Sequence, residues 1–547
     1  MNNYHNLLFF LICISLYSTS AFAQKDYTSK VPKFTFETSL PEQEKQLEEN
    51  LLIKRFQKSR RELSKDKHRP YYHYISPEGK LNDPNGLCFW QGNWHLFYQA
   101  YPPEDPRQHW GHVVSHDLIH WRDLPYAIYP NPEEMVYSGS TWVEDNRVIA
   151  MYHGVSAGTM VAISDDPLLL NWEKISDKAV IAEPKPGEEL PYSVWDPNIW
   201  KKDNTYYSMI GGNLPLGPGG KNARANFLFE SSDLKNWKYL HPFLESDQYS
   251  LVGDDGSCPY FWPIGNNGKY ILLSFSHKSG GKYLIGDYDT KRNKFIVTDG
   301  ENFNHGPVSH GGVHAPSAYP DGKGGVVVIF NMNTGKEIGP GNYTELMTLP
   351  RLLTLDENEK LVISPYGEIE SLRKDKVTIS QMDLPANKEI VLKNVAGDAI
   401  EINLTVDLQK SPAFELDVLR SADKKEYTRI TFYKDGGYPD RDYPGPRPRY
   451  SAIAIDNLES SESDQVHPRI PEVADVLLKE NEPINLRVFI DRSIVEVFVN
   501  DRQCIAVRAY PERSDSKGVS IKAFGSDAVL KSLEAWKMEN IYDQKQN

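Results

Sequence analysis

The sequence predicts an all-β protein, in which a five-bladed β-propeller is followed by a C-terminal β-sandwich. Three observations carry this prediction. Aromatic residues make up 12% of the 547 residues, and Gly and Pro contribute 37 each, which is typical of short strands joined by tight turns. A pair of sequence elements repeats at nearly equal spacing through the first two thirds of the chain. Where the repeat ends, apolar and polar residues alternate as in half-buried strands.

The N-terminus indicates a targeting segment that is not part of the fold. Residues 7–19 form a short apolar run, and Ala21-Phe22-Ala23 after it has the form of a cleavage site. We therefore expect a signal peptide at 1–23, cleaved after Ala23, and a periplasmic or secreted mature protein. The alternative is an N-terminal membrane anchor, although ~20 apolar residues are needed to span a bilayer. We expect no membrane span in the mature chain.

Residues 24–69 are expected to form an N-terminal extension that is partly helical. The stretch 41–66 (PEQEKQLEENLLIKRFQKSRRELSKD) is rich in helix-forming residues, with dense charge and few apolar side chains. This composition favours a solvated helix that packs on the main domain.

The repeat predicts the propeller over residues 70–375. One element, Ser-x-Asp-x-x-x-Trp or a close relative, occurs at 115–121, 164–172 and 231–237, with weaker echoes at 286–295 and 353–361. A second element opens each unit, as NDPNGLCFW (82–90), SGSTW (138–142), WDPNIW (195–200), SCPYFW (257–262) and HAPSAY (314–319). Anchors at 83, 139, 196, 258 and 315 give steps of 56, 57, 62 and 57 residues, each long enough for a four-stranded blade.

The second domain is expected over residues 385–540. Residues 414–420 and 428–435 resemble strands, and 486–511 alternates apolar and polar residues around a turn at Asn500-Asp501. This pattern favours a β-sandwich. No motif in the domain indicates chemistry.

Composition excludes several classes of function. The formal net charge of -14 argues against binding to nucleic acid or to an anionic membrane. Four Cys in 547 residues exclude a disulfide scaffold and a Cys-rich zinc module. Cleavage after Ala23 leaves Cys88, Cys258 and Cys504, which we expect to be buried free thiols.

The openings of the repeat units indicate a sugar site. In a propeller the innermost strands converge on a central channel, so residues at the unit openings line one funnel. Asp83 and Asp196 are each followed by Pro-Asn, and Asp254-Asp255 precede the fourth opening. Carboxyl groups from different blades at one mouth fit glycoside hydrolysis, which uses two of them across a glycosidic bond. Aromatic residues near these elements would supply the flat apolar faces of a sugar pocket.

These residues resemble glycoside hydrolase family 32, the invertase, levanase and inulinase family. The resemblance rests on LNDPNG (81–86), FYQAYP (97–102), WGHVVSHDLIHW (110–121) and YSGS (137–140), and covers about 70–540. It continues with FESSDLKNW (229–237), LPRLL (349–353), SPYGEIESLR (364–373) and LRVFIDRSIVEVFVND (486–501).

The resemblance implies a retaining mechanism on β-fructofuranosides, with no metal and no organic cofactor. It places the nucleophile at Asp83 and matches Asp196 to the Asp that stabilises the transition state. It also implies sugar-binding roles for Asn82, Gln99, Trp110, Tyr137 and Ser138. The expected partner is an oligo- or polysaccharide substrate.

Two positions depart from the family pattern. The family has Arg-Asp-Pro where this chain has Trp195-Asp196-Pro197, and Glu-Cys-Pro where it has Ser257-Cys258-Pro259. The family's Glu is the general acid/base, a role that a Ser hydroxyl cannot fill. We expect Asp255 to supply the acid because residues two apart on an extended chain face the same way. Asp254 is the second candidate and His314 the third, and Trp195 and Ser257 are expected to face the substrate.

Three functions fit these residues. The first is a retaining glycosidase of terminal β-D-fructofuranosides with a relocated acid. The second is an enzyme of the same scaffold acting on a different furanoside or a decorated sugar, and the third is a saccharide-binding protein that has lost catalysis.

Overall fold

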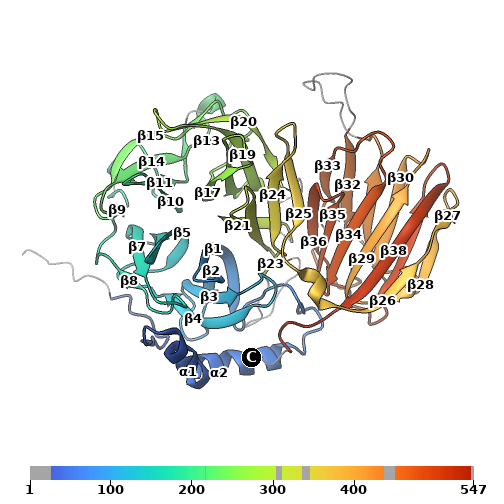
Figure 1. Ribbon diagram of the computed structural model, residues 1–547, viewed down its shortest axis with the longest axis horizontal. Helices are drawn as coiled ribbons and strands as arrows, with labels where there is room; N and C mark the ends of the chain where they lie inside the picture. Colours follow the sequence, from blue (N-terminus) through green and yellow to red (C-terminus); the bar gives the residue numbers. More distant parts are fainter. Residues whose placement is uncertain are drawn as a thin grey trace, which may run out of the picture.

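The computed structural model describes residues 26–185, 187–215, 217–303, 311–334, 345–436, 450–467 and 469–543. The expected signal peptide at 1–23 lies outside them. Among these residues no helix is long and apolar enough to cross a membrane. The described chain folds into a β-propeller and a β-sandwich placed side by side, which confirms the predicted fold class (Figure 1).

The first two blades contain the first and second repeat units. Blade one has strands in the order β1 (Lys80–Trp90), β2 (Asn93–Tyr101), β3 (His109–Ser115) and β4 (Arg122–Ile128). Blade two has the order β5 (Val136–Glu144), β6 (Arg147–Gly154), β7 (Gly158–Ser164) and β8 (Glu173–Lys174), and β9 (Ile181–Ala182) also pairs with β7.

Blades three to five follow the same plan. Blade three has β10 (Pro197–Lys202), β11 (Thr205–Ile210), β14 (Phe227–Ser231) and β15 (Lys238–Pro242), and carries a small hairpin of β12 (Asn213–Leu214) and β13 (Ala223–Arg224). Blade four has β17 (Ser257–Ile264), β18 (Lys269–Ser276), β19 (Gly280–Asp289), β20 (Lys294–Asn302) and the edge strand β16 (Leu244–Glu245). Blade five has β21 (Val313–Pro320), β22 (Val326–Met332), β24 (Arg351–Leu355) and β25 (Leu361–Pro365), with β23 (Leu346–Met347) paired to β22.

The innermost strands close a ring around the channel. Strand β1 contacts β5 and β21, β5 contacts β10, β10 contacts β17, and β17 contacts β21. In Figure 1 these strands surround a common centre. Every innermost strand begins at or beside one of the predicted unit openings, so the channel is lined by residues that the repeat had aligned.

The Ser-x-Asp-x-x-x-Trp element is the turn between the third and fourth strands of a blade. In blade one the Asp117 carboxylate accepts the backbone N–H groups of Ile119 and His120, at 2.9 and 2.8 Å. Asp233 does the same in blade three, and the indole N–H of Trp237 then closes the turn on the Leu234 carbonyl at 2.8 Å. The repeated Asp and Trp are therefore structural.

The extension packs against blade one. Helix α1 (Leu40–Glu49) and helix α2 (Leu51–Leu63) lie at the edge of the propeller (Figure 1), and the Asn50 side chain caps α2 by accepting from Leu52 N and Ile53 N. A buried ion pair joins α2 to blade one, with Arg60 Nε 2.5 Å from Asp123 Oδ2.

The sandwich consists of two packed sheets. One has the order β26 (Arg373–Ile379), β38 (Ala528–Met538), β29 (Ala399–Asp407), β34 (Ile484–Asp491), β35 (Ile494–Val499) and β36 (Gln503–Arg508), with β27 (Met382–Leu384) paired to β38. The other has β28 (Ile390–Ala396), β37 (Gly518–Ala523), β30 (Ala413–Arg420), β31 (Thr428–Tyr433), β32 (Ser451–Asp456) and β33 (Glu472–Val476). The sheets begin at Arg373, earlier than the residue 385 expected from the sequence, because β26 and β27 pair with the distant β38.

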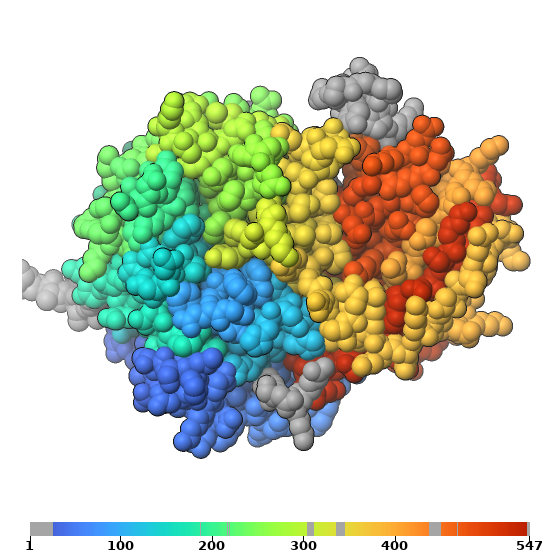
Figure 2. All heavy atoms as spheres, in the orientation of Figure 1, coloured from blue at the N-terminus to red at the C-terminus, as the bar shows by residue number. Residues whose placement is uncertain are grey.

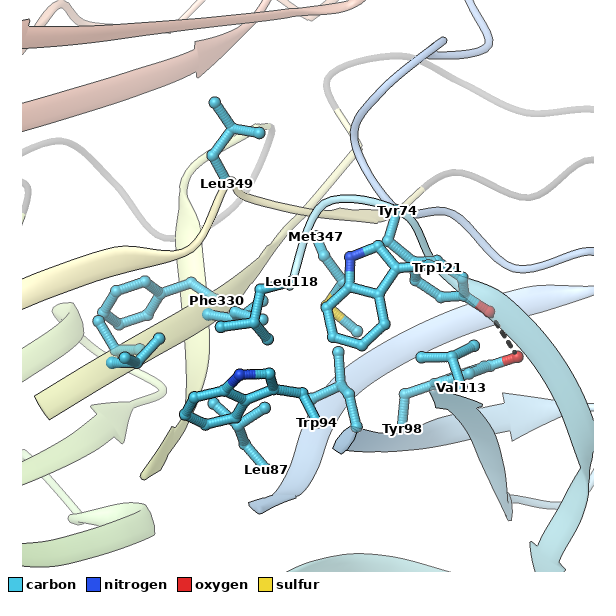
Figure 3. Packing of buried hydrophobic residues seen from close by; sticks show 14 of the residues in the cluster. Tyr74, Leu87, Trp94, Tyr98, Val113, Leu118, Trp121, Phe330, Met347 and Leu349 are labelled. Carbon is cyan, nitrogen blue, oxygen red and sulfur yellow. Dashed lines mark hydrogen bonds between the residues drawn. The ribbon is translucent and has the colours of Figure 1, made fainter. Parts of the chain in front are cut away.

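A continuous apolar core joins blade five to blade one and to the sandwich. Figure 3 shows Trp94 and Val113 of blade one near Phe330 and Met347 of blade five, all members of one buried cluster that extends into the sandwich. The sandwich lies directly against blade five in Figure 2. This continuity fixes the position of the first and last blades, on which the channel depends.

Candidate active site

The predicted site residues lie where the innermost strands lose their regular register. The pairing of β1 with β2 is interrupted between Leu81 and Pro84, which frees Asn82 and Asp83. Equivalent interruptions occur in β5, β17 and β21, and they enclose Tyr137 and Ser138, Cys258, and His314. Bulges of this kind redirect side chains away from the sheet. Asp196 directly precedes β10 at the corresponding place in blade three.

Asp83 is buried and is held by a chain of hydrogen bonds. Ser138 Oγ donates to Asp83 Oδ2 at 2.7 Å, and Gln99 Nε2 donates to Ser138 Oγ at 2.8 Å. Asn82 Nδ2 in turn donates to Gln99 Oε1 at 3.1 Å. The structure thus brings together four of the predicted residues and fixes the orientation of the Asp83 carboxylate.

The other oxygen of Asp83 is left available. Among the described residues Asp83 Oδ1 has no well-formed hydrogen bond, although His314 Nδ1 lies 3.3 Å away. Burial acts to raise the pKa of Asp83, but His314, Ser138 and Cys258 outweigh it, so the pKa lies below its usual value. An ionised carboxylate with one oxygen fixed and one free is suited to nucleophilic attack.

Cys258 links Asp83 to Asp196. The Cys258 backbone N–H donates to Asp196 Oδ2 at 3.1 Å, and its thiol lies 3.5 Å from that oxygen and 3.6 Å from Asp83 Oδ2. Cys258 adopts a left-handed backbone with φ of 48°, which is uncommon for a residue other than Gly. Burial raises the pKa of the Cys258 thiol well above its usual value, so the sulfur keeps its proton.

The two carboxyl groups have opposite pKa shifts. Burial and the nearby Asp83 carboxylate raise the pKa of Asp196 to about 6. Asp83 is therefore the group that ionises first, and its neighbour takes up a proton readily. Environments that push the pKa values of two adjacent titratable groups apart are typical of acid and base pairs in active sites.

Asp254, the second acid candidate, is fully committed to a structural network. Its Oδ1 accepts from the hydroxyls of Ser276 and Ser279, both at 2.8 Å. Its Oδ2 accepts from Leu251 N at 2.7 Å and lies 3.2 Å from Lys282 Nζ. Burial raises its pKa, but the Lys282 charge and these bonds outweigh it, and the pKa lies below the usual value. A buried carboxylate with this many donors is a poor acid.

Asp255, the first acid candidate, contacts a histidine that the sequence had not singled out. His277 Nδ1 lies 2.7 Å from Asp255 Oδ2, and Ser257 N donates to Asp255 Oδ1 at 3.4 Å. Asp255 and Ser257 are both buried. The carboxylate is thus used to hold His277 and the start of β17.

The aromatic candidates occupy different environments. Trp110 is fully buried in the apolar core between blades one and two, where its indole N–H donates to the Tyr137 carbonyl at 2.9 Å. In this structure it supports the backbone of Tyr137 and exposes no face to a sugar. Tyr137 and Trp195 are partly exposed, and Trp195 packs against the apolar cluster between blades two and three.

Two further residues of the site were not singled out by the sequence, although one of them, Tyr260, lies in the fourth unit opening. Tyr260 accepts from Gly86 N and donates to the Gly139 carbonyl, each at 2.9 Å, and so ties blades one, two and four below the carboxylates. Glu345 lies beside Asn331, whose amide donates to Asn82 Oδ1 at 3.0 Å. Burial and the Asp83 carboxylate raise the pKa of Glu345 to about 8.

The carboxylate motifs contain none of His277, Tyr260 and Glu345. Their place in the site therefore follows only from the strand register and from the order of the blades. The assembled site contains paired carboxyl groups at the mouth of a propeller channel, with amide and hydroxyl groups around them. Such a site is that of a glycoside hydrolase.

Comparison with known families agrees with this class. Residues 73–365 match the family model for the N-terminal domain of glycosyl hydrolases family 32, and residues 368–537 match the model for its C-terminal domain. The chain belongs to glycosyl hydrolase family 32, as the resemblance had indicated.

Several relatives align with most of this chain. A levanase from Bacillus subtilis is 28% identical over 517 residues, which cover 87% of this chain and 71% of the relative. A sucrose-6-phosphate hydrolase from Zymomonas mobilis is 26% identical and covers 86% of this chain and 92% of the relative. The crystal structure of fructan 1-exohydrolase IIa from Cichorium intybus superposes with a TM-score of 0.74 at 23% identity, covering 87% of this chain and 98% of that one. This superposition shows that the fold is shared.

Proposed function

We propose that this protein hydrolyses terminal β-D-fructofuranosides with retention of configuration, and that Asp83 is the nucleophile. The observation that carries the proposal is the state of Asp83, a buried carboxylate with a lowered pKa. One of its oxygens is held by Ser138, and the other lies 3.3 Å from His314 Nδ1 without a well-formed hydrogen bond among the described residues. The names of the relatives, among them levanase, sucrose-6-phosphate hydrolase and fructan 6-exohydrolase, support a β-fructoside substrate.

In this proposal the carboxyl groups have separate roles. Asp83 Oδ1 attacks the anomeric carbon and forms the covalent intermediate of a retaining enzyme. Asp196, which holds the Cys258 N–H, hydrogen-bonds the sugar hydroxyls and stabilises the transition state. Asn82 and Gln99 present amides beside Asp83 for the remaining hydroxyls. No metal or organic cofactor takes part.

One observation favours a second substrate class on the same scaffold. Trp195 replaces the charged Arg that the family carries beside Asp196, and its indole is partly exposed. An indole stacks on apolar sugar faces and does not pair with charged groups. This difference favours a neutral furanoside, or one carrying an apolar substituent.

The proposal is tested with the mature chain from residue 24 onward, incubated with sucrose, inulin, levan and aryl furanosides. We expect fructose release, and NMR of the first product should show the same anomer as the substrate. Asp83→Ala is the control and should release no sugar. Saccharide binding in calorimetry without any release by the wild-type chain would instead identify a binding protein.

The proposal includes export of the protein. The apolar run at 7–19 and the Ala21-Phe22-Ala23 sequence support a signal peptide cleaved after Ala23. Expression of the full chain, cell fractionation and N-terminal sequencing test this. A mature N-terminus at Gln24 outside the cytoplasm is expected, whereas an uncleaved chain in the membrane fraction would indicate an anchor.

A further inference from the structure

His277 occupies the end of the blade that faces the position of the missing family acid. It follows β18 directly, and in the β17–β18 ladder Ser257 pairs with Phe275, two residues before His277. His277 is thus the first residue of the turn after β18, next to the end of the strand that pairs with Ser257. The ring centroids of Phe275 and His277 are 5.0 Å apart.

Asp255 fixes which nitrogen of the ring is available. His277 Nδ1 is bonded to Asp255 Oδ2 at 2.7 Å, and the His277 backbone N–H lies 3.3 Å from the same oxygen. Within the described part of the chain, Nε2 has no protein hydrogen-bond partner. The side chain is 71% exposed, whereas that of Asp255 is 10% exposed. With a buried carboxylate bonded to Nδ1, Nε2 is the ring nitrogen that is left available on this exposed side chain.

A short series of contacts connects this imidazole to the nucleophile. The Phe275 ring lies 3.7 Å, between centroids, from the His314 ring, and His314 Nδ1 lies 3.3 Å from Asp83 Oδ1. His277 therefore belongs to the same series of packed rings as His314, and it lies close enough to Asp83 and Asp196 for both carboxylates to act on its charge. Its exposed side chain is accessible to a substrate from solvent.

The charges around His277 favour its protonated form. Asp255, just before β17, raises the pKa of His277 above its usual value, burial opposes this, and Asp196 and Asp83 add to the rise. The cations on the adjacent elements have other anionic or carbonyl partners. Lys282 pairs with Asp254, Lys278 binds the Val252 carbonyl, and Arg224 interacts with Asp247, Asp254 and Asp255.

We propose that His277, positioned by Asp255, is the general acid/base of this enzyme and fills the role of the Glu that the family carries where this chain has Ser257. This inference rests on the proposed hydrolysis of β-fructofuranosides. It also revises the expected role of Asp255, which becomes a positioning residue that acts through the imidazole.

His277 and Asp83 together account for every proton transfer and every bond change of the reaction. In the first step Asp83 Oδ1 bonds to the anomeric carbon, the glycosidic C–O bond breaks, and its electron pair stays on the leaving oxygen. That oxygen takes the proton from His277 Nε2 and departs as an alcohol. In the second step neutral Nε2 takes a proton from water, and the water oxygen bonds to the anomeric carbon. The bond to Asp83 then breaks and restores the carboxylate.

Other groups that could carry a proton lie in less suitable places. His314 is enclosed between Phe275 and Asp83 on the nucleophile's side. Glu345 contacts Asn331 on the Asn82 side, away from Ser257. Asp196 shares the Cys258 thiol with Asp83 and so lies at the level of the nucleophile.

The test compares substrates with poor and good leaving groups. For His277→Ala we expect kcat/KM on sucrose to fall by about 10²–10⁴-fold, the usual contribution of a general acid. On p-nitrophenyl β-D-fructofuranoside the first step needs no proton, so the loss in kcat/KM should stay within about tenfold. Azide, which attacks without a base, should accelerate the variant on the aryl substrate and give fructosyl azide.

Asp255→Asn tests the positioning role. The amide keeps the shape but not the charge, so the pKa of His277 should fall. Because the protonated imidazole is the active form, the high-pH limb of kcat/KM should move to lower pH. A purely structural role would lower activity without moving this limb.

The exposed His116, on the turn outside blade one, provides the matched control, and His116→Ala should retain wild-type kinetics. Equal losses of His277→Ala on both substrates, or no azide product, would overturn the assignment. So would the leaving-group signature appearing in Glu345→Gln or Asp196→Asn instead. If the wild-type chain cleaves no fructoside at all, it is the proposed function that fails.

Discussion

Two buried clusters of charged residues in this molecule differ in how completely their carboxylate oxygens are paired with hydrogen-bond donors. At the junction of the propeller and the sandwich, Asp491 accepts from the backbone N–H groups of Tyr71, Tyr72 and His73 at 2.7–2.9 Å and from His73 Nδ1 at 2.9 Å. Glu496 accepts from His73 Nε2 at 3.1 Å, Leu349 N at 2.7 Å and Arg351 Nη2 at 2.8 Å. Every carboxylate oxygen of this junction has a donor.

At the channel mouth, Asp83 and Asp196 are paired less completely. Asp83 Oδ1 lacks a well-formed hydrogen bond among the described residues, and the pKa of Asp196 rises to about 6. At the junction, burial raises the pKa of Glu496 but Arg351 and His73 outweigh it. The comparison teaches that complete pairing marks a carboxylate as structural, whereas incomplete pairing in a buried place marks one kept available for a substrate.

Among the substitutions that distinguish the two clusters, we expect the largest effect, a loss of activity, at Asp83. Asp83→Asn keeps the shape of the side chain but removes the proposed nucleophile, so kcat/KM should fall by about 10⁴-fold or more. Because the lowered pKa of Asp83 means that its charge favours folding at neutral pH, the melting temperature should fall, by only a few degrees. A variant that retains more than about a tenth of the wild-type activity would show that Asp83 is not the nucleophile.

The converse substitution at the junction should act on stability. Arg351→Met removes the cation beside Glu496 and should lower the free energy of unfolding by about 3–5 kcal/mol, because a buried carboxylate loses its counter-charge. Urea unfolding measures this. Lys537→Met, which breaks the exposed pair with Asp375, is the matched control and should change stability too little to resolve. Similar small changes in both variants would contradict the comparison.

Asp196 should show an opposite stability effect. Its folded pKa of about 6 exceeds the usual 3.8, so its contribution is favourable below pH ~4 and is lost as the pH rises through ~6. Asp196→Asn should therefore be more stable than the wild type at pH 7, by of order 1–2 kcal/mol, while losing activity. The gain should vanish near pH 4. A destabilised variant at pH 7 would show that Asp196 is paired like Asp491.

The smallest effect is expected at Cys258. Cys258→Ala removes the thiol donor between Asp83 and Asp196, and we expect the apparent pKa values of the pH–rate profile to rise by a few tenths of a unit.

The wild-type thiol should react with iodoacetamide only after unfolding, because its pKa is raised and its side chain is buried. Rapid labelling of the folded protein, followed by mass spectrometry, would argue against this environment.

The sequence predicted most of the fold because the propeller repeats. The elements around Asp117 and Asp233 recur since each blade needs the same turn, so their spacing reported the architecture. The junction was not predicted, because Asp491 and Tyr71 are far apart in the chain and neither lies in a repeated pattern. The resemblance implied a sugar-binding role for Trp110, yet its ring is buried between blades as part of the apolar core.

The sequence by itself determined the fold class and the family, and it predicted site roles for Asp83 and Asp196 and a missing acid at Ser257. These follow from local patterns that a chain repeats or retains. Only the tertiary structure decided that Asp254 is fixed by Lys282, that Asp255 holds His277, and that Cys258 lies between the two carboxyl groups. The reason is physical, since pKa and hydrogen bonding depend on which blades meet and on how much water they exclude.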